Sequence, residues 1–159
     1  HNNLALLAIG RPESEGCFCR VNALLKDIIQ DLAGNFDVVL IDGEAGVEQI
    51  NRRVMKTVDH LIAISDTSAK GMNVARTIKH LAFDNQAVNY KNMGMILNRV
   101  RDQQEVKIIR EHIPIDLLGW LPEDDLIREF DFHSRSFLDF PDAATAHRTV
   151  DSIIRNLQI

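Results

Sequence analysis

Cysteine is nearly absent from this sequence, because its 159 residues contain only two, Cys17 and Cys19, with one residue between them. Two cysteines are too few for a disulfide scaffold, so the sequence predicts a protein of a reducing compartment, the cytoplasm. The sequence also lacks any apolar run near the ~20 residues that a membrane span needs. The apolar run at residues 4–9 is short and has no basic flank, which argues against a signal peptide there.

Positive charge is in deficit as well. Lys and Arg together number 18 against 23 Asp and Glu, which gives a formal net charge of −5. Because phosphate recognition requires clustered Lys and Arg, this balance argues against a general nucleic-acid binder. A basic amphipathic helix at the end of the chain, which a membrane-surface ATPase would use, is missing too. We therefore expect neither nucleic acid nor a membrane among the partners.

The composition is otherwise that of a soluble globular protein, with 45% apolar and 26% charged residues. The length fits one domain, so residues 1–159 are predicted to form a single domain. Short apolar runs predict five buried strands, at residues 4–9, 37–42, 60–65, 93–98 and 115–121. Apolar residues spaced three and four apart predict helices at residues 21–32, 71–83, 106–113 and 143–157. This alternation predicts an α/β fold with a mostly parallel sheet flanked by helices.

Ligands of such sheets bind at the carboxyl ends of the strands, so the residues that follow each apolar run are candidates. The run at 37–42 ends in Asp42-Gly43-Glu44-Ala45-Gly46. A carboxylate at this position commonly holds Mg²⁺ through water beside nucleotide phosphates, and Gly43 and Gly46 allow close approach of the backbone to a ligand. A plain strand-to-loop turn with a capping Asp explains the same residues.

Two more strand ends carry polar residues. Asn98-Arg99 follows residues 93–97, and the side-chain amide of Asn98 carries a donor and an acceptor that match the N6 and N7 edge of adenine. Pro122, Glu123 and Asp124 follow the last apolar run and could lie along a purine ring. A turn Asn, and a loop whose Asp124 or Asp125 caps the next helix, are the ordinary alternatives.

The order and spacing of these three strand ends resemble the deviant-Walker P-loop ATPases, the MinD/ParA-like group, over nearly all of residues 4–158. The resemblance implies a P-loop NTPase-like fold that binds ATP or ADP with Mg²⁺. It implies that Asp42 holds Mg²⁺ and water as the catalytic carboxylate, with Gly43 and Gly46 shaping the adjoining loop. It also implies that Asn98-Arg99 and the loop Pro122-Glu123-Asp124 seat adenine.

The cysteine pair points to one branch of that group. Gly16-Cys17-x-Cys19, followed by Val21-Asn22-x-Leu24-Leu25, is similar to the CooC-type maturation ATPases, as is the segment Asp42–Glu48. The resemblance implies an ATP-dependent homodimer that binds a metal ion through the cysteine pair. It also implies that the client is carbon monoxide dehydrogenase or a related metalloenzyme, to which nickel is delivered.

The chemistry of a Cys-x-Cys pair fits that implication. Residues at i and i+2 of an extended segment point to the same side, so Cys17 and Cys19 can bind one ion. A tetrahedral Zn²⁺ site has four ligands at ~2.3 Å, and the pair supplies half of them, so a two-fold dimer would complete the site. Ni²⁺ in a square-planar arrangement would suit the same sulfurs. Two small buried apolar residues, or a redox pair, are the alternatives.

A phosphate-binding P-loop is not found in this sequence, which has no Gly-x-x-x-x-Gly-Lys-[Ser/Thr] motif. In the group that it resembles, this loop precedes the position of residue 4. The sequence is therefore interpreted as the distal part of a P-loop ATPase domain, incomplete at its N-terminus. We expect this chain alone to hydrolyse no ATP. We also expect a gap or an unpaired edge in its sheet, so that the chain either self-associates or closes its strands over the gap.

Other functions fit parts of the pattern. The chain could be a non-enzymatic metal-binding dimerisation module that kept the fold, or another ATPase of the MinD/ParA-like group. A phospho-receiver domain also has an Asp after its third strand, but it needs a Lys after the fifth strand and an acidic pair after the first. Residues 117–122 contain no Lys, and Gly10-Arg11-Pro12 is not an acidic pair.

Overall fold

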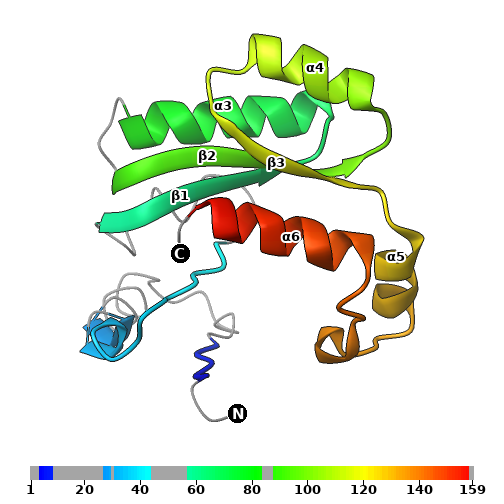
Figure 1. Ribbon diagram of the computed structural model, residues 1–159. Coiled ribbons are helices and arrows are strands. Elements are labelled where there is room, and N and C mark those ends of the chain that lie inside the picture. Colours follow the sequence, from blue (N-terminus) through cyan, green and yellow to red (C-terminus); the bar gives the residue numbers. More distant parts are fainter. Residues whose placement is uncertain (1–3, 9–26, 30, 44–56, 84–87, 158–159) are drawn as a thin grey trace, which may run out of the picture.

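The computed structural model describes residues 4–8, 27–29, 31–43, 57–83 and 88–157. Its centre is a parallel sheet of three strands, in the order β1 (Thr57–Ser65), β2 (Asn89–Val100) and β3 (Leu117–Pro122). Consecutive parallel strands need a connection that crosses over the sheet, and a helix follows each of the first two strands (Figure 1). The predicted α/β fold with a parallel sheet flanked by helices is confirmed.

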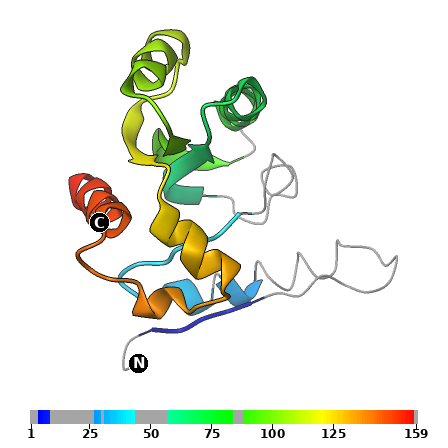
Figure 2. The same cartoon turned by 90° about the vertical axis from the view of Figure 1, so that its right-hand side faces the viewer.

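Helices cover both faces of the sheet. Helices α3 (Ala69–Phe83) and α4 (Gln103–His112) lie on one face, and α6 (Thr145–Asn156) lies on the other (Figures 1 and 2). Helix α5 (Asp125–Phe132) and a short 3₁₀ helix, η1 (Phe137–Asp139), connect β3 to α6. Residues 27–29 and 31–33 are also helical and overlap the end of the longer helix predicted at 21–32.

The main core lies between the sheet and helices α3 and α4. Strand β2 runs through its centre, with Leu97 fully buried and Met95 only 1% exposed. Helix α3 adds Ala75 and Met72, and α4 adds Val106 and Ile109. Because β2 is paired on both sides, its apolar residues must serve as packing surface, which is why an apolar run predicted this strand well.

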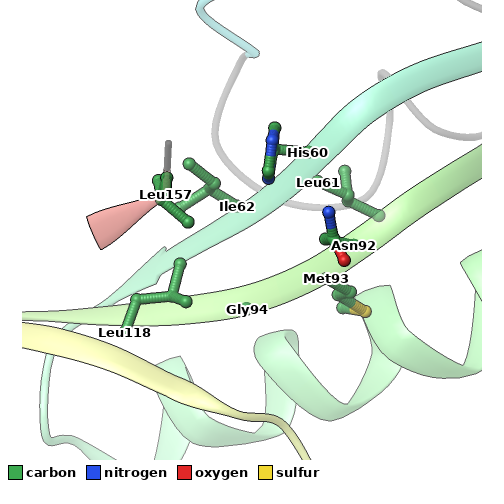
Figure 3. A pocket seen from close by; sticks show the side chains of 8 residues that line it. All are labelled: His60, Leu61, Ile62, Asn92, Met93, Gly94, Leu118 and Leu157. Atoms are coloured by element: carbon green, nitrogen blue, oxygen red, sulfur yellow. The ribbon is translucent and has the colours of Figure 1, made fainter. Parts of the chain in front are cut away.

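The opposite face packs closely against α6 through glycine. A Cβ atom on Gly119 would lie 2.5 Å from Cδ1 of Ile153, a buried residue of α6. Towards β1 this face has a shallow hollow lined by His60, Ile62, Asn92, Gly94, Leu118 and Leu157 (Figure 3). The Nδ1 atom of His60 is buried there and has no hydrogen-bond partner among the described residues.

Two predicted strands are wrong in this structure. Residues 4–8 and 38–43 have no regular secondary structure and lie outside the sheet. Their apolar side chains are exposed, with Leu6 91% and Leu40 92% exposed. A strand forms only where a neighbour satisfies its backbone N–H and C=O groups, and within the described residues β1 pairs with β2 alone. Among the residues that the structure describes, β1 and β3 are the two edge strands of the sheet.

The segment between β3 and α6 is held by aromatic contacts. Phe130 is 1% exposed and packs edge-on against Phe140, with ring centroids 5.0 Å apart. The guanidinium carbon of Arg135 lies 3.9 Å from the centroid of the Phe130 ring, a cation–π contact. Aromatic packing thus fixes a segment whose mixed sequence shows no periodicity.

We expect the change Gly119→Ala to lower the free energy of unfolding by about 1–3 kcal/mol, because the new methyl group would overlap Ile153 and push α6 from the sheet. Chemical denaturation would measure the effect. Gly34→Ala is the matched control, since a Cβ atom there meets nothing within 4 Å. Equal stability of the two variants would contradict the close packing of α6.

Candidate functional site

The carboxyl ends of the three strands meet at one edge of the sheet, because the strands are parallel. Val100 of β2 pairs with Pro122 of β3, and the backbone N–H of Glu123 donates to the carbonyl oxygen of Val100 at 3.0 Å. The structure therefore brings together two predicted groups that lie more than twenty residues apart in the sequence, Asn98-Arg99 and Pro122–Asp124. The end of β1 lies at the same edge, since β1 pairs with β2 as far as Ser65 and Leu97.

A two-point ion pair links the ends of β2 and β3. Arg101 Nε lies 2.7 Å from Glu123 Oε2, and a terminal nitrogen of Arg101 lies 3.3 Å from Glu123 Oε1. The hydrogen bond from Arg101, and then its charge, lower the pKa of Glu123 below its ordinary value of 4.5. Because both side chains are exposed, water screens the pair, and its main effect is to fix the geometry of this edge.

A β-bulge interrupts β2 at Asn98 and Arg99. Leu97 pairs with Trp120 and Val100 with Pro122, so β2 contains one residue more than β3 over this interval. Arg99 has a φ of 57°, in the left-handed region that costs a non-glycine residue on the order of 1 kcal/mol. Bulges of this kind redirect side chains beside functional sites.

The bulge fixes the amide of Asn98. The backbone N–H of Arg99 donates to Oδ1 of Asn98 at 2.9 Å. Within the described part of the chain, Nδ2 of the same amide makes no hydrogen bond, and the side chain is half-buried. The amide thus presents a donor that no other described residue uses.

The end of β1 adds an acidic residue that the sequence analysis did not identify. Oδ1 of Asp66 accepts a hydrogen bond from the backbone N–H of Ser68 at 3.0 Å and another from the Ser68 hydroxyl. The hydrogen bonds from Ser68 lower the pKa of Asp66, and the charge of Arg99 lowers it further. Arg99 also contributes to the lowered pKa of Glu123, so its positive charge acts on carboxylates from two strands.

Asp66 could have been found from the sequence by the rule that found Asp42. It follows the apolar run at 60–65 directly, at the carboxyl end of a strand. Gly71 then allows α3 to begin against this turn, because a Cβ atom there would lie 2.5 Å from Asp66 Oδ1. The Ser68 hydroxyl oxygen accepts the backbone N–H of Gly71 at 3.1 Å, which caps the helix.

Asp124 caps a helix, as one of the two sequence interpretations held. Its Oδ1 accepts the backbone N–H of Leu126 at 2.9 Å at the start of α5. One carboxylate oxygen is therefore engaged locally. The loop Pro122–Asp124 is held by the ion pair of Glu123 on one side and by this cap on the other.

The remaining predicted site residues are Asp42, Gly43, Gly46, Cys17 and Cys19. Asp42 and Gly43 lie in the exposed segment outside the sheet. Gly46, Cys17 and Cys19 lie outside the described residues. Among the residues that are described, no cluster of three His, Cys, Asp or Glu side chains could hold a metal ion. No helix in the same part of the chain is long and apolar enough to cross a membrane.

The sequence of the chain is similar to those of several ATP-binding proteins. The chain is 34% identical over 154 residues to an uncharacterized ATP-binding protein of Methanocaldococcus jannaschii, covering 96% of the chain and 60% of that relative. It is 28% identical over 163 positions to the carbon monoxide dehydrogenase accessory protein CooC of Rhodospirillum rubrum, covering 99% of the chain and 61% of CooC. The chain is similar in sequence to the CooC- and MinD-like ATP-binding proteins. No protein-family model matches it.

Solved structures of MinD share the fold of this CooC- and MinD-like chain. MinD of Aquifex aeolicus matches with a TM-score of 0.66 and 20% identity, over 86% of the chain and 60% of MinD. MinD of Pyrococcus horikoshii, in complex with Mg-ADP, matches with a TM-score of 0.66 and 17% identity, over 86% of the chain and 56% of MinD. The chain thus spans about three fifths of the lengths of its relatives.

We expect the change Arg101→Gln to raise the pKa of Glu123 toward its ordinary value, because the change removes the hydrogen bond and the charge that lower it. A carboxyl pKa lowered by folding stabilises the protein above its unfolded pKa, and this contribution is lost as the pH falls through the lowered folded pKa. The contribution of Glu123 should therefore disappear below about pH 4.5 in the wild type and be nearly absent in the variant. A carboxyl NMR titration would measure both values.

Asp151 is the internal control for this titration. Its pKa is lowered in the same way by Arg155, at 2.8 Å on α6, and should not change in Arg101→Gln. An unchanged Glu123 titration in the variant would show that the ion pair between the strand ends does not form in solution.

Proposed function

We propose that this chain is the distal part of a CooC-like ATPase domain that couples ATP binding to the delivery of nickel to carbon monoxide dehydrogenase or a related metalloenzyme. The observation that carries the proposal is the joined edge of β2 and β3, where Asn98-Arg99 meets Pro122–Asp124. Similarity to a carbon monoxide dehydrogenase accessory protein over 99% of the chain supports it. In this proposal residues 1–159 form one domain together with the segments that the relatives contain in addition.

The joined edge fits the base end of an adenine nucleotide. The unused Nδ2 donor of Asn98 suits the N7 acceptor of adenine, and Oδ1 retains a second lone pair for the N6 amino group. Pro122 stiffens the loop that would lie along the ring. Asp66, Glu123 and Asp124 contribute carboxylates at this end, and Arg99 and Arg101 are their cationic neighbours. The edge therefore has no excess of positive charge to hold phosphates, which would lie away from it.

Mg²⁺ and the phosphates would require Asp42. In the proposed whole protein Asp42 holds Mg²⁺ through water, and the loop of Gly43 and Gly46 moves in response to the γ-phosphate. Bound Mg²⁺ would neutralise charge that develops on the phosphates during hydrolysis. In this structure Asp42 lies in an exposed segment outside the sheet.

The metal to be delivered would be held by Cys17 and Cys19 from each of two chains. Four thiolates complete the shell of Zn²⁺ or Ni²⁺, whereas one pair completes half of it. Sharing of one ion requires a homodimer with the two pairs facing each other. A dimer controlled by nucleotide could bind and release the ion, which is the coupling that a delivery factor needs.

Metal content measured together with oligomeric state tests the metal half of this proposal. The wild-type protein should hold one Ni²⁺ or Zn²⁺ per two chains, and Cys17→Ser should lose the ion because each thiolate pair would be incomplete. Inductively coupled plasma mass spectrometry with light scattering would measure both quantities. The change Ser14→Ala is a control that leaves the sulfurs in place. Retention of the ion in Cys17→Ser would contradict the proposed delivery of metal by the cysteine pair.

ATP binding by the whole protein that contains this chain tests the nucleotide half. We expect Asn98→Ala to weaken ATP binding about tenfold, because two hydrogen bonds to the base are lost. Isothermal titration calorimetry would measure the affinity. Asn92→Ala is a matched control on the same strand, since Asn92 lines the hollow near α6 instead of the carboxyl edge. Equal ATP affinity of the two variants would show that the adenine base does not bind at Asn98.

A further inference from the structure

We propose that Arg99 is a positioning residue for base recognition, and that it acts through its backbone: its left-handed conformation directs its N–H to Oδ1 of Asn98 and so fixes which atom of the Asn98 amide faces the base. This inference rests on the proposed function, because it concerns the same adenine site. The observations that carry it are the φ of 57° at Arg99 and the hydrogen bond of 2.9 Å to Oδ1 of Asn98.

An asparagine amide has two orientations that exchange its donor and its acceptor. With Oδ1 held by the Arg99 N–H, Nδ2 is the atom left to donate, and the amide cannot turn over without losing this bond. Adenine presents an amino donor at N6 beside the N7 acceptor, whereas guanine presents acceptors at both O6 and N7. A fixed amide therefore accepts adenine and opposes guanine, while an amide free to turn would distinguish them less.

The bulge that holds Arg99 is supported from three directions. Val100 accepts the backbone N–H of Glu123 at 3.0 Å, and Arg101 pairs with the Glu123 carboxylate at 2.7 Å. The charge of Arg99 itself is placed where it acts on Asp66, which follows β1, and on Glu123, which follows β3. These contacts offset the cost of a left-handed conformation at a residue with a side chain.

Substitutions at Arg99 separate the backbone role from a role of the guanidinium. Arg99→Gly, Arg99→Asn and Arg99→Val all remove the positive charge, but glycine and asparagine adopt a positive φ readily and valine does not. We expect the ratio of ATP affinity to GTP affinity to be retained in the first two variants and to fall roughly fivefold in Arg99→Val, the loss of about one oriented hydrogen bond. Calorimetry on the whole protein would measure the ratios.

A ratio in Arg99→Val equal to that in Arg99→Gly would overturn the backbone role and leave the nucleotide site itself intact. Comparison among the three variants cancels any loss of affinity that comes from the missing charge. Absence of ATP binding by the wild-type protein would instead overturn the proposed function, and this inference with it. Circular dichroism would confirm that each variant is folded before its affinities are compared.

Two measurements make the test independent of whether Arg99→Val folds. Wild type should bind 7-deaza-ATP, which lacks the N7 acceptor, about fivefold more weakly than ATP, and Asn98→Ala, which lacks the whole amide, should not distinguish the two. Hydrogen exchange of the Arg99 amide should be several-fold faster in Asn98→Ala than in wild type, because its acceptor is gone. Equal binding of both nucleotides by wild type, or equal exchange in the two proteins, would contradict the proposed orientation of the amide.

Discussion

Parallel pairing of β2 with a strand on each side is the constraint on which the rest of this structure depends. The central strand buries Met95 and Leu97 against α3 and α4, so the hydrophobic effect holds it at the middle of the sheet. Because β1 and β3 run in the same direction, their carboxyl ends are brought to one edge with that of β2. Residues far apart in sequence become neighbours for this reason alone.

At that edge, specific polar contacts fix the relative positions of the ends of β2 and β3. A bulge adds one residue to β2, a backbone hydrogen bond joins Val100 to Glu123, and Arg101 binds the Glu123 carboxylate at two points. These exposed contacts contribute little to stability in water, but they determine where Asn98 and the loop after β3 lie. The edge combines an amide donor that no other described residue uses with carboxylates that Arg99 and Arg101 balance, an arrangement suited to a neutral base.

Similarity to CooC and MinD supports the fold and the proposed function to different degrees. The chain matches CooC over nearly its whole length and shares its fold with MinD structures at identities of 20% or less. The fold is therefore well supported, while metal delivery rests on the cysteine pair and on that relation. The two halves of the proposed function depend on different residues, so either half can fail without the other.

The sequence by itself determined the strand and helix order from residue 57 onward, because buried parallel strands require continuous apolar runs and helices require three- and four-residue spacing. It also identified Asn98 and Asp124 at strand ends. The apolar pattern of residues 37–42 could not show whether they form a strand, since a strand forms only where a neighbouring strand accepts its backbone hydrogen bonds. Likewise, only the tertiary structure revealed the left-handed Arg99 and the nearby charge of Asp66, because a bulge arises from the mismatch between two paired strands and is not encoded in either one alone.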